Sequence, residues 1–213
     1  ELTPHEARYS VKISVVSGEL KTKLSVNEAG NYEANHVIAP TGMSKLIARG
    51  SIAEVSEFRN DENGVIPVAY RSNDSLSRDA ERADIRFDWE RGEASGTVND
   101  QQMTIALNEL LHDRVSIQYE LMYDLLNGKP ETDYVLFDLD KMRVAKVRNV
   151  GTRTVKTKAG RFEVTGIEHQ KDGSLRKTTL WCAPELDYLP VIIEQYRKDK
   201  LKFRASLTEY TPL

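Results

Sequence analysis

The chain has 213 residues, of which 39% are apolar and 30% charged, and its net charge is -3. A chain of this length can bury one sizeable core, so we expect a single domain over residues 1–213. The charge balance lacks the basic excess of a protein that neutralises phosphates, so nucleic acid is not a predicted partner. No apolar run approaches the roughly 20 residues of a transmembrane helix, and the one cysteine, Cys182, excludes an internal disulfide framework.

Alternation of apolar and polar residues with a period of two dominates the first half of the chain and predicts strands with one buried face. It begins in residues 9–15, resumes in residues 20–26 after a Ser-Gly turn, and continues in residues 32–38. These segments predict an antiparallel meander. The alternation loosens in residues 40–50, which favour a short helix or an irregular crossing.

Further strands are expected in residues 52–58, 66–70, 85–89, 94–98 and 103–107. Pro67 has no N–H to donate, so we expect it at a sheet edge or at the start of a strand. Residues 71–83 are polar and charged, and they form the most loop-like stretch of the chain.

One segment, residues 113–127, predicts an α-helix. Apolar residues recur at i, i+4, i+7 and i+11 from Val115 to Leu126, which places them on one face. Asp113 is a suitable N-cap, and Pro130 lies where a helix should stop.

The second half returns to strands, expected in residues 134–138, 142–150, 152–157, 162–169, 175–181, 191–196 and 201–208. The predicted fold class is therefore mainly β: a curved antiparallel sheet or incomplete β-barrel with one main α-helix at about residues 113–127.

Catalytic motifs are missing from this sequence, and we expect a protein that is not an enzyme and uses no cofactor or metal. No pair of histidines has the spacing that places two metal ligands on one helix face, and Glu168 and His169 should point to opposite faces of a strand. Cys182 has no neighbouring base in the sequence that could activate its thiol, so we predict that it is a small buried residue. Carboxylates such as Asp138 and Asp140 are better explained as solvated strand or turn residues than as a catalytic pair.

Residues 143–161 carry seven Lys and Arg and no acidic residue. This segment could form a basic surface for anionic headgroups or another polyanion, with Arg148, Arg153 and Lys156 as the candidates. The alternative is that these cations occupy the solvent-facing positions of strands and protect sheet edges.

Large aromatic and aliphatic side chains are the last group of candidate functional residues. In a curved sheet crossed by one helix, such residues either fill the core, which we favour, or line an apolar cavity. If a cavity is present, the candidate ligand-lining residues are Phe87, Trp89, Tyr119, Met122 and Trp181.

Several short signatures occur in one order along the chain: residues 66–70 (IPVAY), 87–89 (FDW), 113–116 (DRVS), 151–157, 160–163 (GRFE), 180–184 (LWCAP) and 188–190 (YLP). Together they resemble the bacterial family known as domain of unknown function 3108. The resemblance implies an exported, periplasmic or envelope protein of a Gram-negative bacterium whose signal peptide has been removed, which fits a chain that begins at Glu1. It implies no catalytic residues, and its β-rich pattern is similar to lipoprotein-carrier folds that hold acyl chains.

Three functions remain open from the sequence. The first is a non-enzymatic periplasmic protein that binds a hydrophobic small molecule, a lipid or an acyl chain, on the concave face of its sheet. The second is an envelope interaction module that binds a protein or polysaccharide through a sheet edge or the basic surface. The third is a hydrolase whose active site has no recognised motif.

Overall fold

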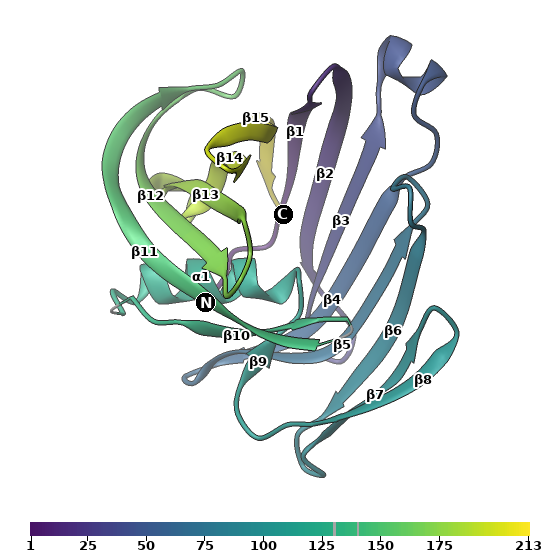
Figure 1. Cartoon of the computed structure of the whole chain (residues 1–213). Helices are drawn as coiled ribbons and strands as arrows, with labels where there is room; N and C mark the ends of the chain where they lie inside the picture. The colour runs from purple at the N-terminus through teal and green to yellow at the C-terminus, as the bar shows by residue number, and fades with distance from the viewer. Residues whose placement is uncertain (130, 140) are drawn as a thin grey trace.

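The computed structural model describes residues 1–129, 131–139 and 141–213. Pro130 and Asp140, expected as a helix stop and a candidate carboxylate, lie outside the described residues. Within them the chain forms a single fifteen-stranded sheet that curls around one α-helix (Figure 1). The predicted fold class, a mainly β protein with a curved antiparallel sheet and one main helix, is confirmed.

The first half of the chain is a meander of neighbouring strands interrupted by one short 3-10 helix. Its elements are β1 (His5–Ile13), β2 (Val16–Val26), β3 (Tyr32–Pro40), η1 (Gly42–Leu46), β4 (Ile52–Asp61), β5 (Gly64–Asp74), β6 (Glu81–Asp88), β7 (Glu93–Val98) and β8 (Gln101–Ala106). The short helix η1 falls where the sequence predicted a helix or crossing.

The second half begins with the helix and continues as a second meander. Its elements are β9 (Leu111–His112), α1 (Ser116–Leu126), β10 (Tyr134–Asp138), β11 (Lys141–Lys156), β12 (Arg161–Lys171), β13 (Arg176–Ala183), η2 (Pro184–Leu186), β14 (Leu189–Arg197) and β15 (Lys200–Pro212). Every described strand pair is antiparallel except β9 with β10.

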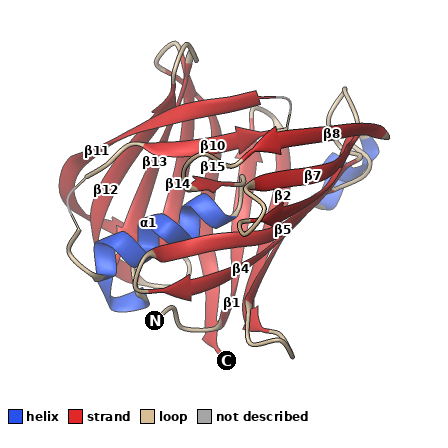
Figure 2. Cartoon of the chain, turned by 90° about the horizontal axis from the view of Figure 1, so that it is seen from below, coloured by secondary structure: helices blue, strands red, loops and turns tan. Residues whose placement is uncertain are grey.

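The two meanders join through β1 and β15, which pair from His5 with Pro212 to Ile13 with Phe203. The strand order therefore runs β8 to β1, then β15 to β9, and the two ends of the chain lie in the middle of the sheet. Figure 2 shows the sheet curving around α1, which lies inside the curve. The sheet stays open, because β8 and β9 form its two edges.

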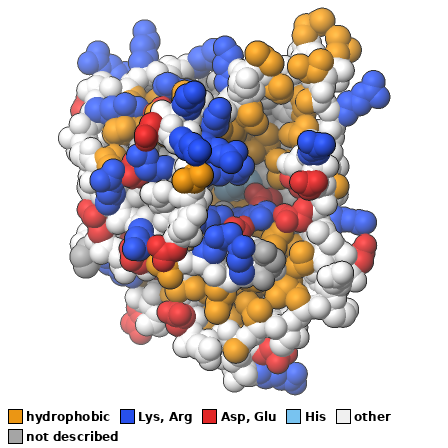
Figure 3. All heavy atoms as spheres, in the orientation of Figure 1, with side chains coloured by type: hydrophobic (Ala, Val, Ile, Leu, Met, Phe, Trp, Pro, Cys, Tyr) orange, Lys and Arg blue, Asp and Glu red, His pale blue; other side chains and the backbone are white. Residues whose placement is uncertain are grey.

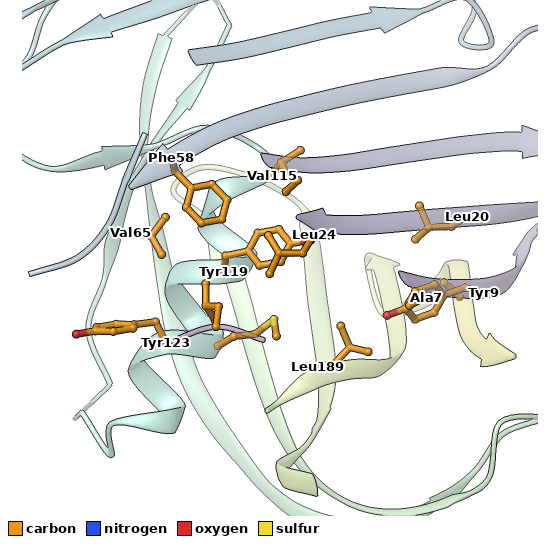
Figure 4. Packing of buried hydrophobic residues seen from close by; sticks show 14 of the residues in the cluster. Ala7, Tyr9, Leu20, Leu24, Phe58, Val65, Val115, Tyr119, Tyr123 and Leu189 are labelled. Carbon is orange, nitrogen blue, oxygen red and sulfur yellow. The ribbon is translucent and has the colours of Figure 1, made fainter. Parts of the chain in front are cut away.

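In the first half of the chain the core lies on one face of the sheet, as the alternation predicts, whereas in β12 and β14 the opposite face also carries buried residues such as Val164 and Ile192. In β1, residues 5, 7, 9 and 11 are buried and the residues between them are exposed. Buried side chains of both halves meet at the helix, where Tyr119 packs against Phe58 with ring centroids 5.4 Å apart (Figure 4). No helix in the described part of the chain is long and apolar enough to cross a membrane.

Asp113 caps α1 and also fastens it to the sheet. Its buried carboxylate accepts hydrogen bonds from the backbone N–H groups of Val115 and Ser116, both at 2.8 Å. It also accepts a hydrogen bond from the Ser56 hydroxyl of β4 at 2.6 Å. The predicted cap is therefore confirmed, and one side chain fixes both the start of the helix and its position on β4.

Two local predictions hold only in part. Pro67 lies within β5, opposite Phe58, where the β4–β5 register shifts, but the pairing of β5 with β6 begins only at Ala69, so Pro67 has a strand partner on one side, as at an edge. Such an irregularity accommodates a residue with no N–H to donate. Within residues 71–83, the loop is confined to residues 75–80, because pairing between β5 and β6 makes residues 71–74 and 81–83 strand and buries the small Ser72 and Ala83.

Replacing Asp113 with Ala should leave two helix N–H groups and the Ser56 hydroxyl without their acceptor in a buried setting. We expect a loss of about 2–4 kcal/mol in the free energy of unfolding, measured by urea titration. Asp61→Ala is the matched control, because Asp61 accepts a backbone hydrogen bond in an exposed turn. Equal losses in the two variants would contradict the role given to Asp113.

Candidate functional site: a cavity between helix and sheet

A cavity of about 360 Å³ lies between α1 and the concave face of strands β10 to β14. This volume is within the range of pockets that hold small molecules. Its apolar lining comes from the helix and from five strands: Ile117, Leu121, Leu136, Val147, Ile167, Leu180 and Ile193.

Strand register arranges this lining in rows across the sheet. Ile167 of β12 is opposite Leu180 of β13, which is opposite Ile193 of β14. Because side chains two residues apart share a face, the next row on the same face contains residues 169, 178 and 195. The cavity is therefore apolar along one row and polar along the next, with His, Thr and Gln side chains.

Charged side chains stand at the polar side of the cavity. Arg114, at the start of the helix segment, pairs with Glu81 and Asp138, each at 2.8 Å, and Lys171 pairs with Asp138 at 2.8 Å. Burial alone would raise the pKa of Asp138, but the hydrogen bond and charge of Lys171, with the charge of Arg114, lower it overall. Asp138 is thus a charged anchor that holds two cavity-lining cations in place.

Arg176 differs from these two cations. It lines the cavity and is exposed, and its guanidinium has no ion pair or hydrogen bond with any described residue. Its positive charge is therefore available to a ligand at the mouth of the cavity. Figure 3 shows Lys and Arg side chains around a hollow near the middle of one face of the molecule.

His169 and Glu54 complete the polar part of the lining. Burial, reinforced by the charge of Lys171 and opposed by Glu168, lowers the pKa of His169 to about 4, so its imidazole is neutral at pH 7. The His169 ring has no hydrogen-bond partner among the described residues. Burial raises the pKa of Glu54 even though its carboxylate accepts a hydrogen bond from the Tyr70 hydroxyl at 2.6 Å.

The five aromatic and aliphatic candidates from the sequence do not line this cavity. Phe87 and Trp89 stack on each other in the core of the first half, and the Trp89 indole donates to the Pro67 carbonyl at 2.6 Å. Tyr119 and Met122 are buried on the other side of the helix, within the main core. For these four side chains the structure agrees with the alternative reading, in which they fill the core.

Trp181, the fifth candidate, lies on the face of the sheet opposite to the cavity. The Arg153 guanidinium stacks on its ring at 3.5 Å from the centroid, and its indole donates to Glu194 at 3.0 Å. Gly166 makes room for the ring, because a Cβ at that position would lie 2.5 Å from it. Such a stacked cation contributes about 0.5–2 kcal/mol, so this cluster has a structural role.

The basic candidates on β11 are largely neutralised by neighbouring carboxylates. Arg148 pairs with Glu168 at 2.7 Å and Arg153 pairs with Glu194 at 3.2 Å, while Lys156 is exposed. Glu168 and His169 point to opposite faces, as predicted, with Glu168 on the outer ion pair and His169 in the cavity. The three candidate cations therefore do not form an uncompensated patch.

Cys182 is completely buried, next to the apolar side chains around Leu121 and Ile167. Burial raises the pKa of its thiol far above the ordinary value. The thiol is thus protonated and inaccessible, which agrees with the small apolar role predicted for it.

Comparisons with known proteins give a family and a fold. The family model described as "Protein of unknown function (DUF3108)" matches residues 6–205. No curated protein matches the chain. The crystal structure of a beta-barrel-like protein of domain of unknown function DUF1849 from Brucella abortus is similar, with a TM-score of 0.66 and 14% sequence identity. That match covers 100% of this chain and 99% of the other chain, and it supports the fold alone.

The buried histidines should make folding sensitive to mild acid. Burial lowers the pKa of His36, His112 and His169 from 6.5 to about 4. Between these values the unfolded chain binds protons at these histidines that the folded chain does not, so their contribution to the free energy of unfolding should fall as the pH falls from about 6.5 to 4. Above about pH 7.5, where the unfolded histidines are also neutral, they should contribute almost no pH dependence.

The contribution of His169 can be isolated by urea titration of wild type and His169→Gln at pH 7, 5.5 and 4.5. The variant should lose less stability between pH 7 and 4.5 than the wild type does. Lys146→Gln, an exposed change on β11, serves as the control and should keep the wild-type slope. A His169→Gln slope equal to that of the wild type would contradict burial of a neutral imidazole.

Proposed function

The chain belongs to the DUF3108 family of proteins of unknown function, and from that premise we propose that it is a binding protein, not an enzyme, for a small amphiphile. The ligand we propose has one apolar chain and an anionic head. The observation that carries this proposal is the division of the cavity into an apolar row of side chains and a polar, cationic row beside it.

Each part of such a ligand has a matching part of the cavity. An acyl chain would displace water from the row formed by Ile167, Leu180 and Ile193, which contributes about 25 cal/mol for each Å² of apolar surface removed from water. A carboxylate or phosphate head would then face the free guanidinium of Arg176 and the neutral His169. An anion is favoured over a cation there because Arg114 and Lys171 also line the cavity.

An envelope or periplasmic location in a Gram-negative bacterium forms part of the proposal and rests on the family alone. A protein of that compartment would meet lipids and lipoprotein acyl chains. Cell fractionation of the full-length gene product tests the location, and recovery in the cytoplasmic fraction would overturn that part.

The ligand proposal is tested by displacement of a fluorescent fatty acid. Ile117→Trp should fill part of the cavity and weaken binding at least about tenfold, because the added indole would occupy space that the ligand needs. Leu126→Trp, on the same helix but outside the cavity, should bind within about twofold of wild type. No binding to the wild type, or equal weakening by both variants, would overturn the proposal.

Head-group preference gives a second readout that does not depend on cavity volume. Arg176→Gln should weaken binding of a long-chain fatty acid about three- to tenfold, since it removes one charged hydrogen bond at a solvated site. Binding of the fatty alcohol with the same chain length should not change, because that head carries no charge. Equal effects on acid and alcohol would rule out an anionic head at Arg176.

A second candidate function, addition of a strand from a partner protein, is favoured by the free edge of the sheet. Strand β8 ends the strand order and carries no charged side chain or proline from Gln101 to Leu107. Uncharged edges of this length readily accept another strand unless something protects them. Thr104→Lys should abolish cross-linking of a partner protein to a cross-linking probe attached at residue 102. An unchanged cross-link would exclude strand addition at the β8 edge.

A further inference from the structure

Three chain segments lie toward the same end of the sheet. The β1–β2 turn contacts the segment between β3 and β4, because the Ser17 N–H donates to the Ser44 hydroxyl at 2.9 Å and the Thr41 N–H to the Ser17 carbonyl at 3.0 Å. The β14–β15 turn lies at the same end of the sheet, since Ile13 at the end of β1 is opposite Phe203 and β15 continues from there to Lys200. We name this surface the basic-apolar rim.

Large apolar side chains protrude from the rim into solvent. The most exposed are Val15 (81%), Met43 (78%), Ile47 (69%) and Leu46 (68%), with Leu201 and Ile13 nearby at 47% and 40%. Single exposed apolar residues are ordinary, but six at one end of the sheet indicate a surface that binds something. The helix η1 and its flanking loop project beyond the ends of the neighbouring strands (Figure 1).

Cations surround these apolar side chains with little compensation. The rim carries exposed Lys12, Lys45, Arg49, Lys198, Lys200 and Lys202. None of these six has an ion pair with another described residue, in contrast to the paired cations Arg148 and Arg153 of β11. Residues 7–18 and 34–53 contain no acidic residue, and Asp199 is the one carboxylate within the β14–β15 turn.

We infer that the basic-apolar rim docks onto an anionic lipid bilayer surface. Apolar turns that enter the headgroup region, framed by unpaired Lys and Arg that face lipid phosphates, are the combination that binds such a surface. A second copy of the chain fits less well, because a symmetric contact would bring six cations against the same six cations. A nucleic acid would not require the protruding Met, Leu and Ile side chains.

The rim also lies toward the end of β13 and β14 where the cavity becomes polar. Arg176, which lines the cavity, is opposite Arg197, which directly precedes the β14–β15 turn. A bilayer at the rim would therefore be near the cationic side of the cavity. The docking inference stands on the rim alone and does not require that the cavity hold a lipid.

Co-sedimentation with vesicles tests the inference. The wild type should bind vesicles of phosphatidylcholine with 30% phosphatidylglycerol, bind pure phosphatidylcholine much more weakly, and dissociate as salt rises to 0.5 M. Replacing Lys12, Lys45 and Arg49 with Gln should lower the partition coefficient roughly a hundredfold, at about fivefold for each cation. No binding of the wild type to anionic vesicles would overturn the inference.

Two further variants separate rim docking from unspecific effects. Met43→Ser with Ile47→Ser should lower vesicle binding at least about tenfold without changing the melting temperature, because both side chains are exposed. Val26→Ser removes an exposed apolar residue at the other end of β2 and should bind as the wild type does. Equal losses of vesicle binding in the rim variant and in Val26→Ser would reject bilayer docking. A wild type that forms a dimer in light scattering and does not bind vesicles would also reject it.

Discussion

The pairing of β1 with β15 is the constraint on which the rest of this structure depends. It joins residues 5–13 to residues 203–212 and so converts two separate meanders into one curved sheet. Pairing between segments so distant in sequence has a large entropic cost of loop closure, which the buried row around Tyr9 and Leu207 must offset. Once the halves are joined, α1 is surrounded by strands of both.

The position of α1 decides which apolar residues become core and which line a cavity. Tyr119 and Met122 belong to the main core, in which the Tyr119 ring packs against Phe58 of the first half. Ile117 and Leu121 face the second half, whose strands leave about 360 Å³ unfilled. One helix therefore serves two purposes: its more aromatic side closes the core, and its aliphatic side forms one wall of the proposed ligand site.

Compensation of charge distinguishes the structural cations from those proposed to meet a partner. Asp138 holds Arg114 and Lys171, and Glu194 holds Arg153 against Trp181, so these cations are fixed within the fold. Arg176 and the cations of the basic-apolar rim have no such counter-charge among the described residues. Net charge and composition average over both kinds, which is why a slightly acidic protein can still present a local basic surface.

The sequence by itself determined the local features: the alternating strands, the Asp113 cap, the burial of Cys182 and the mainly β fold class, because each depends on neighbouring residues. Pro67 within β5 shows the limit, since a bulge is visible only in the register with β4. Tertiary structure alone decided the site. Ile167, Leu180 and Ile193 belong to three strands, and no local sequence pattern gives the register that brings them together. Trp89 and Trp181 were the largest side chains among the sequence candidates, but Trp89 packs in the core and Trp181 packs on the face opposite the cavity. Large aromatic side chains gain most from close packing.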